Sequence, residues 1–123
     1  MQDRNSLLVL VAGPYRSGTG DDPDQLAANV DAMNRVALEL FRAGHTPVTG
    51  EALALPLVEL AGSRHVGDEV FDEIFHPLAR RLVAHCDAVL RIGGPSAGAD
   101  AMVATARAAG KIVATSMDEL PLA

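Results

Sequence analysis

The chain has 123 residues and a formal net charge of −6, from 16 acidic and 10 basic side chains. This length matches one ordinary domain, so we expect a single domain over residues 1–123. The acidic excess disfavours binding to polymeric nucleic acid, and three Phe, one Tyr and no Trp provide no aromatic series on which bases could stack.

The N-terminal part predicts two strands and one long helix. Residues 7–12 form a continuous apolar run, which is typical of a buried parallel strand and too short for a membrane span or a signal peptide. We therefore expect no contact with a membrane. Asp22 and Pro23 predict the start of a helix that ends at Gly44. Residues 45–49 predict a second strand, and Pro47 places it at an edge of the sheet.

The remaining elements include one segment whose structure stays open. Residues 51–61 are apolar with a proline in the middle, so a broken helix and an extended segment over a ligand both fit, and the role of residues 51–66 is undetermined. Residues 68–85 predict a helix that Pro77 kinks or splits. Residues 86–92 predict a strand, residues 93–98 a glycine-rich turn, residues 99–109 a helix and residues 111–115 a last strand.

The alternation of strands and helices predicts an α/β fold. We expect a Rossmann-like, flavodoxin-like three-layer sandwich whose mainly parallel sheet has about four to five strands. Cys86 is the only cysteine, and we expect it to pack in the core and not to act as a nucleophile. A lone thiol suits a reducing compartment, so we expect a cytoplasmic protein. The absence of a Cys/His cluster with metal-ligand spacing leads us to expect neither a metal nor a cofactor.

Two glycine-rich loops are candidates for a ligand site. Ligands of open parallel sheets bind beyond the carboxyl ends of the strands, where the strand order reverses. If the first and third strands are neighbours, loops 13–22 and 93–98 meet at that crevice, and their backbone N–H groups can approach a phosphate or carboxylate. The alternative is that these residues only build ordinary turns. The predicted binding residues are Gly13, Pro14, Tyr15, Arg16, Ser17, Gly18, Gly94, Ser96 and Gly98.

Three segments resemble the nucleoside 2-deoxyribosyltransferase superfamily, which includes nucleotide N-glycosidases and uncharacterised bacterial members. They are residues 10–16 after the first strand, residues 86–89 in the third strand, and residues 94–99 before a helix that leads into residues 110–113. The resemblance implies a Rossmann-like fold and a homodimer or larger homo-oligomer. It also implies a nucleoside or nucleotide as the ligand, with cleavage or transfer at the N-glycosidic bond.

The residues that this resemblance implies for catalysis are replaced. Met102 stands where the family has its nucleophilic Glu, Ala79 where it has an Asp, and Val9 or Leu10 where it has a Tyr. None of these side chains can form a glycosyl ester or transfer a proton. Two functions therefore remain open: an enzyme with a non-standard catalytic set, or a catalytically silent nucleotide-binding sensor or scaffold.

Three nearby residues are candidate substitutes for the replaced groups. Asp100 lies close to Met102 in sequence, although on another side of the helix. Asp72 and His76 share one face of the helix over residues 68–85 and could act as a base, or Asp72 only complements the helix dipole. Arg91 lies near the crevice, where it could contact an anion or extend into water.

Overall fold

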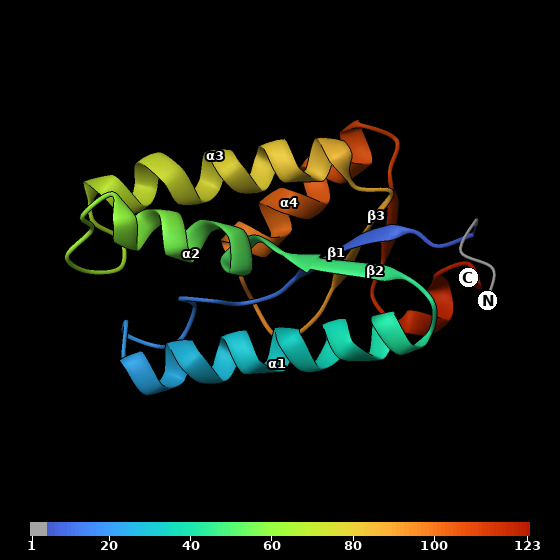
Figure 1. The fold of residues 1–123 in the computed structure, drawn as a ribbon, viewed down its shortest axis with the longest axis horizontal. Coiled ribbons are helices and arrows are strands. Elements are labelled where there is room, and N and C mark those ends of the chain that lie inside the picture. The colour runs from blue at the N-terminus through green and yellow to red at the C-terminus, as the bar shows by residue number, and fades with distance from the viewer. Residues whose placement is uncertain (1–4) are drawn as a thin grey trace.

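The computed structural model describes residues 5–123, which form a four-stranded parallel sheet between layers of helices (Figure 1). The strands are β1 (Leu8–Ala12), β2 (Thr46–Thr49), β3 (Ala88–Arg91) and β4 (Ile112–Ala114). Their order in the sheet is β2-β1-β3-β4, and all three pairings are parallel. The chain is thus a Rossmann-like three-layer α/β sandwich, as predicted. β1 and β3 are neighbours, and β2 lies at the edge that Pro47 indicated.

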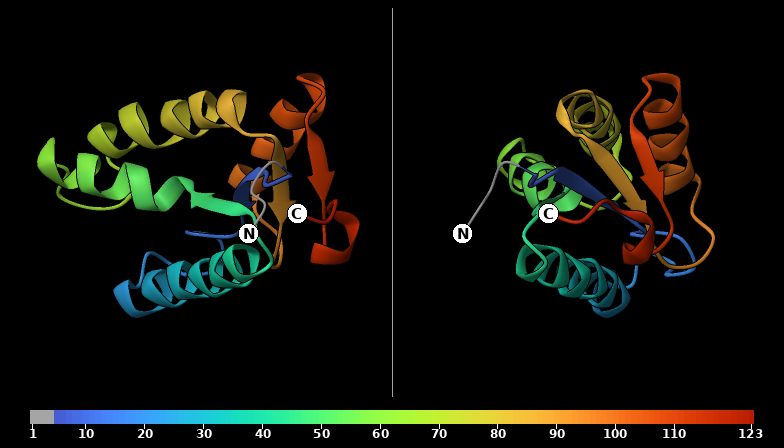
Figure 2. Two further views of the ribbon diagram at one scale, coloured as in Figure 1. Left: turned by 45° about the vertical axis from the view of Figure 1, so that its right-hand side comes forward. Right: turned by 90° about the vertical axis from the view of Figure 1, so that its right-hand side faces the viewer.

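The helices are α1 (Pro23–Arg42), α2 (Gly50–Leu60), α3 (Glu69–His85) and α4 (Ala97–Ala108), followed by a short 3-10 helix, Met117–Glu119. Figure 2 shows α1 on one side of the sheet and α3 and α4 on the other. The residue before each α-helix caps that helix with its side chain. The side chain accepts a hydrogen bond from a backbone N–H of the first turn, and this bond satisfies a donor that would otherwise be unpaired. These capping residues are Asp22, Thr49, Asp68 and Ser96. Between residues 5 and 123, no helix has the length and apolar character that crossing a bilayer requires.

The central strand β1 is covered on both faces. Val9 and Val11 pack with residues of α1, whereas Leu10 and Ala12 pack with residues of α3 and α4. Successive side chains of a strand point to opposite faces, so a strand buried on both sides needs apolar residues at every position. This requirement explains the unbroken apolar run in the sequence.

Three segments differ from the expectation or complete it. Residues 51–61, for which a broken helix and an extended segment both fitted the sequence, lie almost entirely in α2, and α2 follows β2 directly. α3 is a single helix through Pro77, so the predicted split is absent, because buried side chains on both sides of the proline, Phe75 and Ala79, anchor the helix. α4 begins at Ala97, two residues earlier than predicted, because Ser96 caps it.

Candidate functional site

The loops that follow β1 and β3 lie against each other at the carboxyl ends of the strands. A Cβ atom on Gly13 would lie 2.9 Å from Cγ1 of Ile92. A Cβ atom on Gly93, whose φ is +77°, would lie 2.7 Å from Cδ of Pro14. Larger residues at these positions would push the loops apart. The two glycine-rich loops therefore meet where the strand order predicts a crevice.

A cavity of about 230 Å³ opens beside these loops. Its walls come from the β1–α1 loop, the first turn of α2, one side of α3 and the N-terminal half of α4. A second, more open depression shares Ser17 and Ser96 with it. Each predicted binding residue lines one or both: Gly13, Tyr15, Arg16, Ser17, Ser96 and Gly98 line the cavity, and Pro14, Ser17, Gly18, Gly94 and Ser96 line the depression.

Stacked aromatic rings form one wall of the cavity. The ring centroids of Tyr15 and Phe75 are 5.6 Å apart, and those of Phe71 and Phe75 are 4.7 Å apart, with interplanar angles of 18° and 15°. The His76 ring meets Phe75 edge-on at 5.5 Å and also lines the cavity. Burial, and then the negative charge of Glu51, raise the pKa of Tyr15. A planar ring of a ligand could stack against these side chains.

Other residues of the cavity lining present hydrogen-bond donors. The Oγ atom of Ser96 accepts a hydrogen bond from the Ala99 N–H at 3.1 Å, which leaves the Ser96 hydroxyl proton for another acceptor. Before Ala99, the N–H groups of the first two residues of α4 have no partner within the helix, and the helix dipole favours negative charge at this end. Ser17 lines the cavity from the neighbouring loop. Together these groups can bind an anion.

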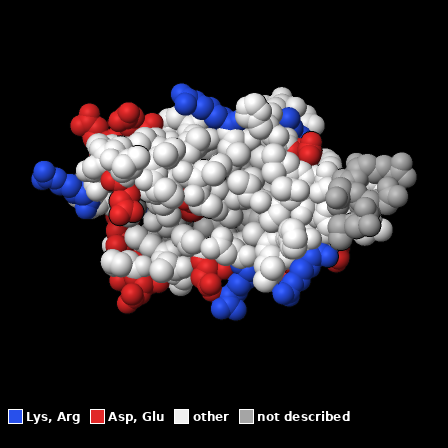
Figure 3. All heavy atoms as spheres, in the orientation of Figure 1, with Lys and Arg blue, Asp and Glu red and all other residues white. Residues whose placement is uncertain are grey.

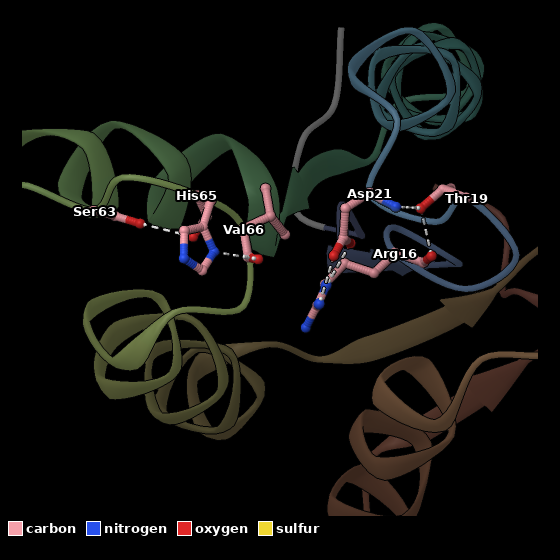
Figure 4. Close-up of polar contacts among 6 residues, drawn as sticks. All are labelled: Arg16, Thr19, Asp21, Ser63, His65 and Val66. Carbon is pink, nitrogen blue, oxygen red and sulfur yellow. Dashed lines mark hydrogen bonds and ion pairs between the residues drawn. The ribbon is translucent and has the colours of Figure 1, made fainter.

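Arg16 is already paired with an acidic residue of its own loop (Figure 4). Its Nε and Nη2 atoms donate to Oδ1 and Oδ2 of Asp21, both at 2.9 Å, and these hydrogen bonds hold the pKa of Asp21 below its usual value. The Thr19 hydroxyl donates to the Arg16 carbonyl at 2.6 Å and accepts from the Asp21 N–H at 3.0 Å, so it is used within the loop. An anion that binds Arg16 must therefore share or displace Asp21.

Glu51 is a buried carboxyl group in the cavity wall and was not among the residues predicted for the site. The residue is 2% exposed, and its Oε1 atom has no hydrogen-bond partner among the described residues. The ion pairs found within residues 5–123 do not include it. Burial raises the pKa of Glu51 to about 7. The sequence did hold one signal: Glu51 follows the carboxyl end of β2, at the edge of the sheet where ligands bind.

One of the three candidate catalytic residues lines the cavity. His76 lines the cavity, whereas Asp72 and Asp100 do not. Asp100 is instead paired with Arg91. Ala79 and Met102, which stand at the replaced catalytic positions, both line the cavity, and Glu51 is the only acidic residue among its described lining residues.

Arg91 supports the turn that follows β3. It donates to the carbonyl oxygens of Ile92 and Gly94 as well as to Asp100, and its side chain is 13% exposed. Its guanidinium group thus stabilises the glycine-rich turn and does not extend into water.

Cys86 is 1% exposed, and burial raises the pKa of its thiol, as expected for a packing residue.

Acidic side chains gather on the face shown in Figure 3 toward the end of the molecule where α1 and α3 begin. Asp24 in the first turn of α1, and Glu69 and Asp72 in the first turn of α3, complement the dipoles of these helices. This face therefore offers no broad positive field. An anionic ligand would have to be bound by the specific donors inside the crevice.

Models of known protein families and curated proteins were both compared with this chain, and neither comparison gives a match.

Proposed function

We propose that this chain binds a small nucleoside- or nucleotide-like anionic ligand in the cavity beside the loops that follow β1 and β3. The observation that carries the proposal is that both glycine-rich loops contribute to one cavity, whose lining includes both stacked aromatic rings and hydrogen-bond donors. Its volume of about 230 Å³ lies just below the common range for ligand pockets, roughly 300–1,000 Å³, and favours a small ligand.

The two kinds of lining residue suit the two parts of such a ligand. The base would lie against Tyr15 and Phe75, where its faces contact apolar rings. The phosphate would accept hydrogen bonds from Ser17, Ser96 and the first N–H groups of α4. Arg16 would contribute a charged donor by exchanging one of its bonds to Asp21.

Isothermal titration with a panel of nucleosides and nucleoside 5′-monophosphates tests this function. Arg16→Ala should weaken binding of a monophosphate about tenfold, because a hydrogen bond to a charged group contributes roughly 1.5–3 kcal/mol before competition with Asp21. Arg35→Ala is the matched control: Arg35 also pairs with an aspartate, Asp31 at 2.7 Å, but it does not line the cavity. Failure of every compound to bind, or equal effects of the two substitutions, contradicts the proposal.

Cleavage or transfer at the N-glycosidic bond is a second candidate function, suggested by the resemblance to nucleoside 2-deoxyribosyltransferases. The buried carboxyl group of Glu51 in the cavity favours this candidate over a silent sensor or scaffold, because it supplies the acid that positions 79 and 102 lack. The homodimer that the resemblance implies stays a prediction, which sedimentation velocity tests.

A further inference from the structure

We propose that Glu51 is the acid–base group of the cavity, whose carboxyl group contacts the bound ligand and exchanges a proton with it. This inference rests on the proposed function, because it requires that a ligand occupies the cavity. It assigns a role to a residue that neither the sequence motifs nor the resemblance identified.

The first support is the unpaired oxygen atom. Buried polar atoms in folded proteins almost always have a hydrogen-bond partner, because an unpaired one lowers stability. The Oε1 atom of Glu51 is buried and has no partner among residues 5–123, and Glu51 is one of the residues that line the cavity. A ligand in the cavity can supply the missing partner.

The second support is the fixed position of the backbone that carries Glu51. Thr49 is the last residue of β2, and its Oγ1 atom accepts a hydrogen bond from the Ala52 N–H at 3.1 Å as the cap of α2. Glu51 therefore lies in the first turn of a helix that is joined directly to the sheet. A group held in this way can meet a ligand with little loss of freedom.

The third support is the set of groups around the carboxyl group. The titratable residues that share the cavity with Glu51 are Tyr15 and Arg16 from the β1–α1 loop and His76 and Arg80 from α3. The lining residues of α4 are uncharged. Because the pKa of Glu51 is about 7, both its neutral and its ionised forms are present near neutral pH. Such a group can give a proton and take it back.

The proposed chemistry uses water as the second reactant. As the bond between the sugar carbon and the base nitrogen breaks, its electron pair stays on the nitrogen, which takes the proton of Glu51. Water then adds its oxygen to the sugar carbon and gives one proton to the Glu51 carboxylate. The products are the free base and the hydroxylated sugar, and Glu51 returns to its neutral form. One carboxyl group thus acts first as an acid and then as a base.

Base release and binding are measured together on the full chain, with ribo- and deoxyribonucleoside 5′-monophosphates as probes. Glu51→Gln should lower the rate of base release at least about 100-fold, while the dissociation constant of the monophosphate changes about threefold or less. Glu51→Asp should keep part of the rate, because it keeps a carboxyl group. Glu59→Gln is the matched control, since Glu59 is an exposed residue of the same helix outside the cavity. The wild-type rate should fall as the pH rises above about 7, because the neutral acid is lost.

The outcomes separate the two proposals. If no monophosphate binds the wild-type chain, the proposed function fails and the role of Glu51 fails with it. If monophosphates bind but none releases its base, or if Glu51→Gln releases base at the wild-type rate, the role of Glu51 is overturned and the binding function stands. Circular dichroism of each variant confirms that the folded chain is being compared.

Discussion

Arg91, the last residue of β3, donates a hydrogen bond from Nε to Oδ1 of Asp100 in the first turn of α4, over 3.1 Å. The same guanidinium group also binds the carbonyl oxygens of Ile92 and Gly94. Hydrogen bonds from this one side chain therefore connect the end of β3, the turn that follows it and the first turn of α4. These bonds fix the shape of a turn that the proposed ligand must contact.

Arg91→Ala should loosen this turn. We expect the free energy of unfolding to fall by about 1–2 kcal/mol, because two carbonyl groups and a carboxylate lose their donor, and we expect weaker binding of nucleoside monophosphates. Urea unfolding and isothermal titration measure the two effects. Arg107→Ala, in the last turn of α4, is the control. Equal affinity in Arg91→Ala and the wild type would show that the turn keeps its shape without the guanidinium group.

Gly93→Ala should separate the two loops of the site. The residue has a φ of +77°, and a new Cβ atom would lie 2.7 Å from Cδ of Pro14. The left-handed backbone alone should lower the free energy of unfolding by about 1–2 kcal/mol, and the steric contact should add to this loss. Gly94→Ala tests the same turn at a position where a Cβ atom meets nothing within 4 Å. Similar unfolding midpoints for both variants would contradict the close contact.

Burial of Glu51 should make the stability of the chain depend on pH. The pKa rises from 4.5 to about 7 on folding, so the folded state binds this proton more tightly than the unfolded state. The contribution of Glu51 to stability is then greatest below pH 4.5 and falls as the pH rises through about 7, by about 3 kcal/mol in total. Glu51→Gln should lack this loss, whereas Glu59→Gln should retain it. Urea unfolding between pH 4.5 and pH 8.5 provides the comparison, and parallel curves for wild type and Glu51→Gln would refute the prediction.

Asp68 should stabilise the start of α3 through its charge. It accepts hydrogen bonds from the Phe71 N–H at 2.9 Å and the Arg64 N–H at 2.8 Å, which hold the pKa of its carboxyl group well below the usual range. This stabilisation is present above the ordinary pKa and is lost as the pH falls through the lowered one. Asp68→Ala should lower Tm by several degrees at pH 7, and Asp68→Asn by less, because asparagine also caps helices. Equal Tm values for all three proteins would exclude this role.

Most of the fold follows from local patterns in the sequence. The apolar run of β1, the Asp22–Pro23 start of α1 and Pro47 at the edge strand each reflect a nearby physical requirement. The continuity of α3 through Pro77 could not be read in this way. It depends on packing by residues on other elements, which can outweigh one lost hydrogen bond.

The site was predictable only in part. The glycine-rich loops were found because small residues before a helix have a recognisable pattern, and the strand order brings these loops together. Glu51 was missed because nothing in an apolar segment reveals which carboxyl group turns inward. Its burial depends on the direction in which α2 leaves the sheet, and this direction is a property of the folded chain.

Thr49 both ends β2 and caps α2, so no residue separates the strand from the helix. An insertion of one residue at this junction would rotate every following side chain of the first turn by about 100°. Residue 51 can therefore be substituted without changing its direction, whereas an insertion or deletion between β2 and residue 51 would change that direction. Redesign of this protein for other small molecules should begin with substitutions at position 51 and should leave the junction intact.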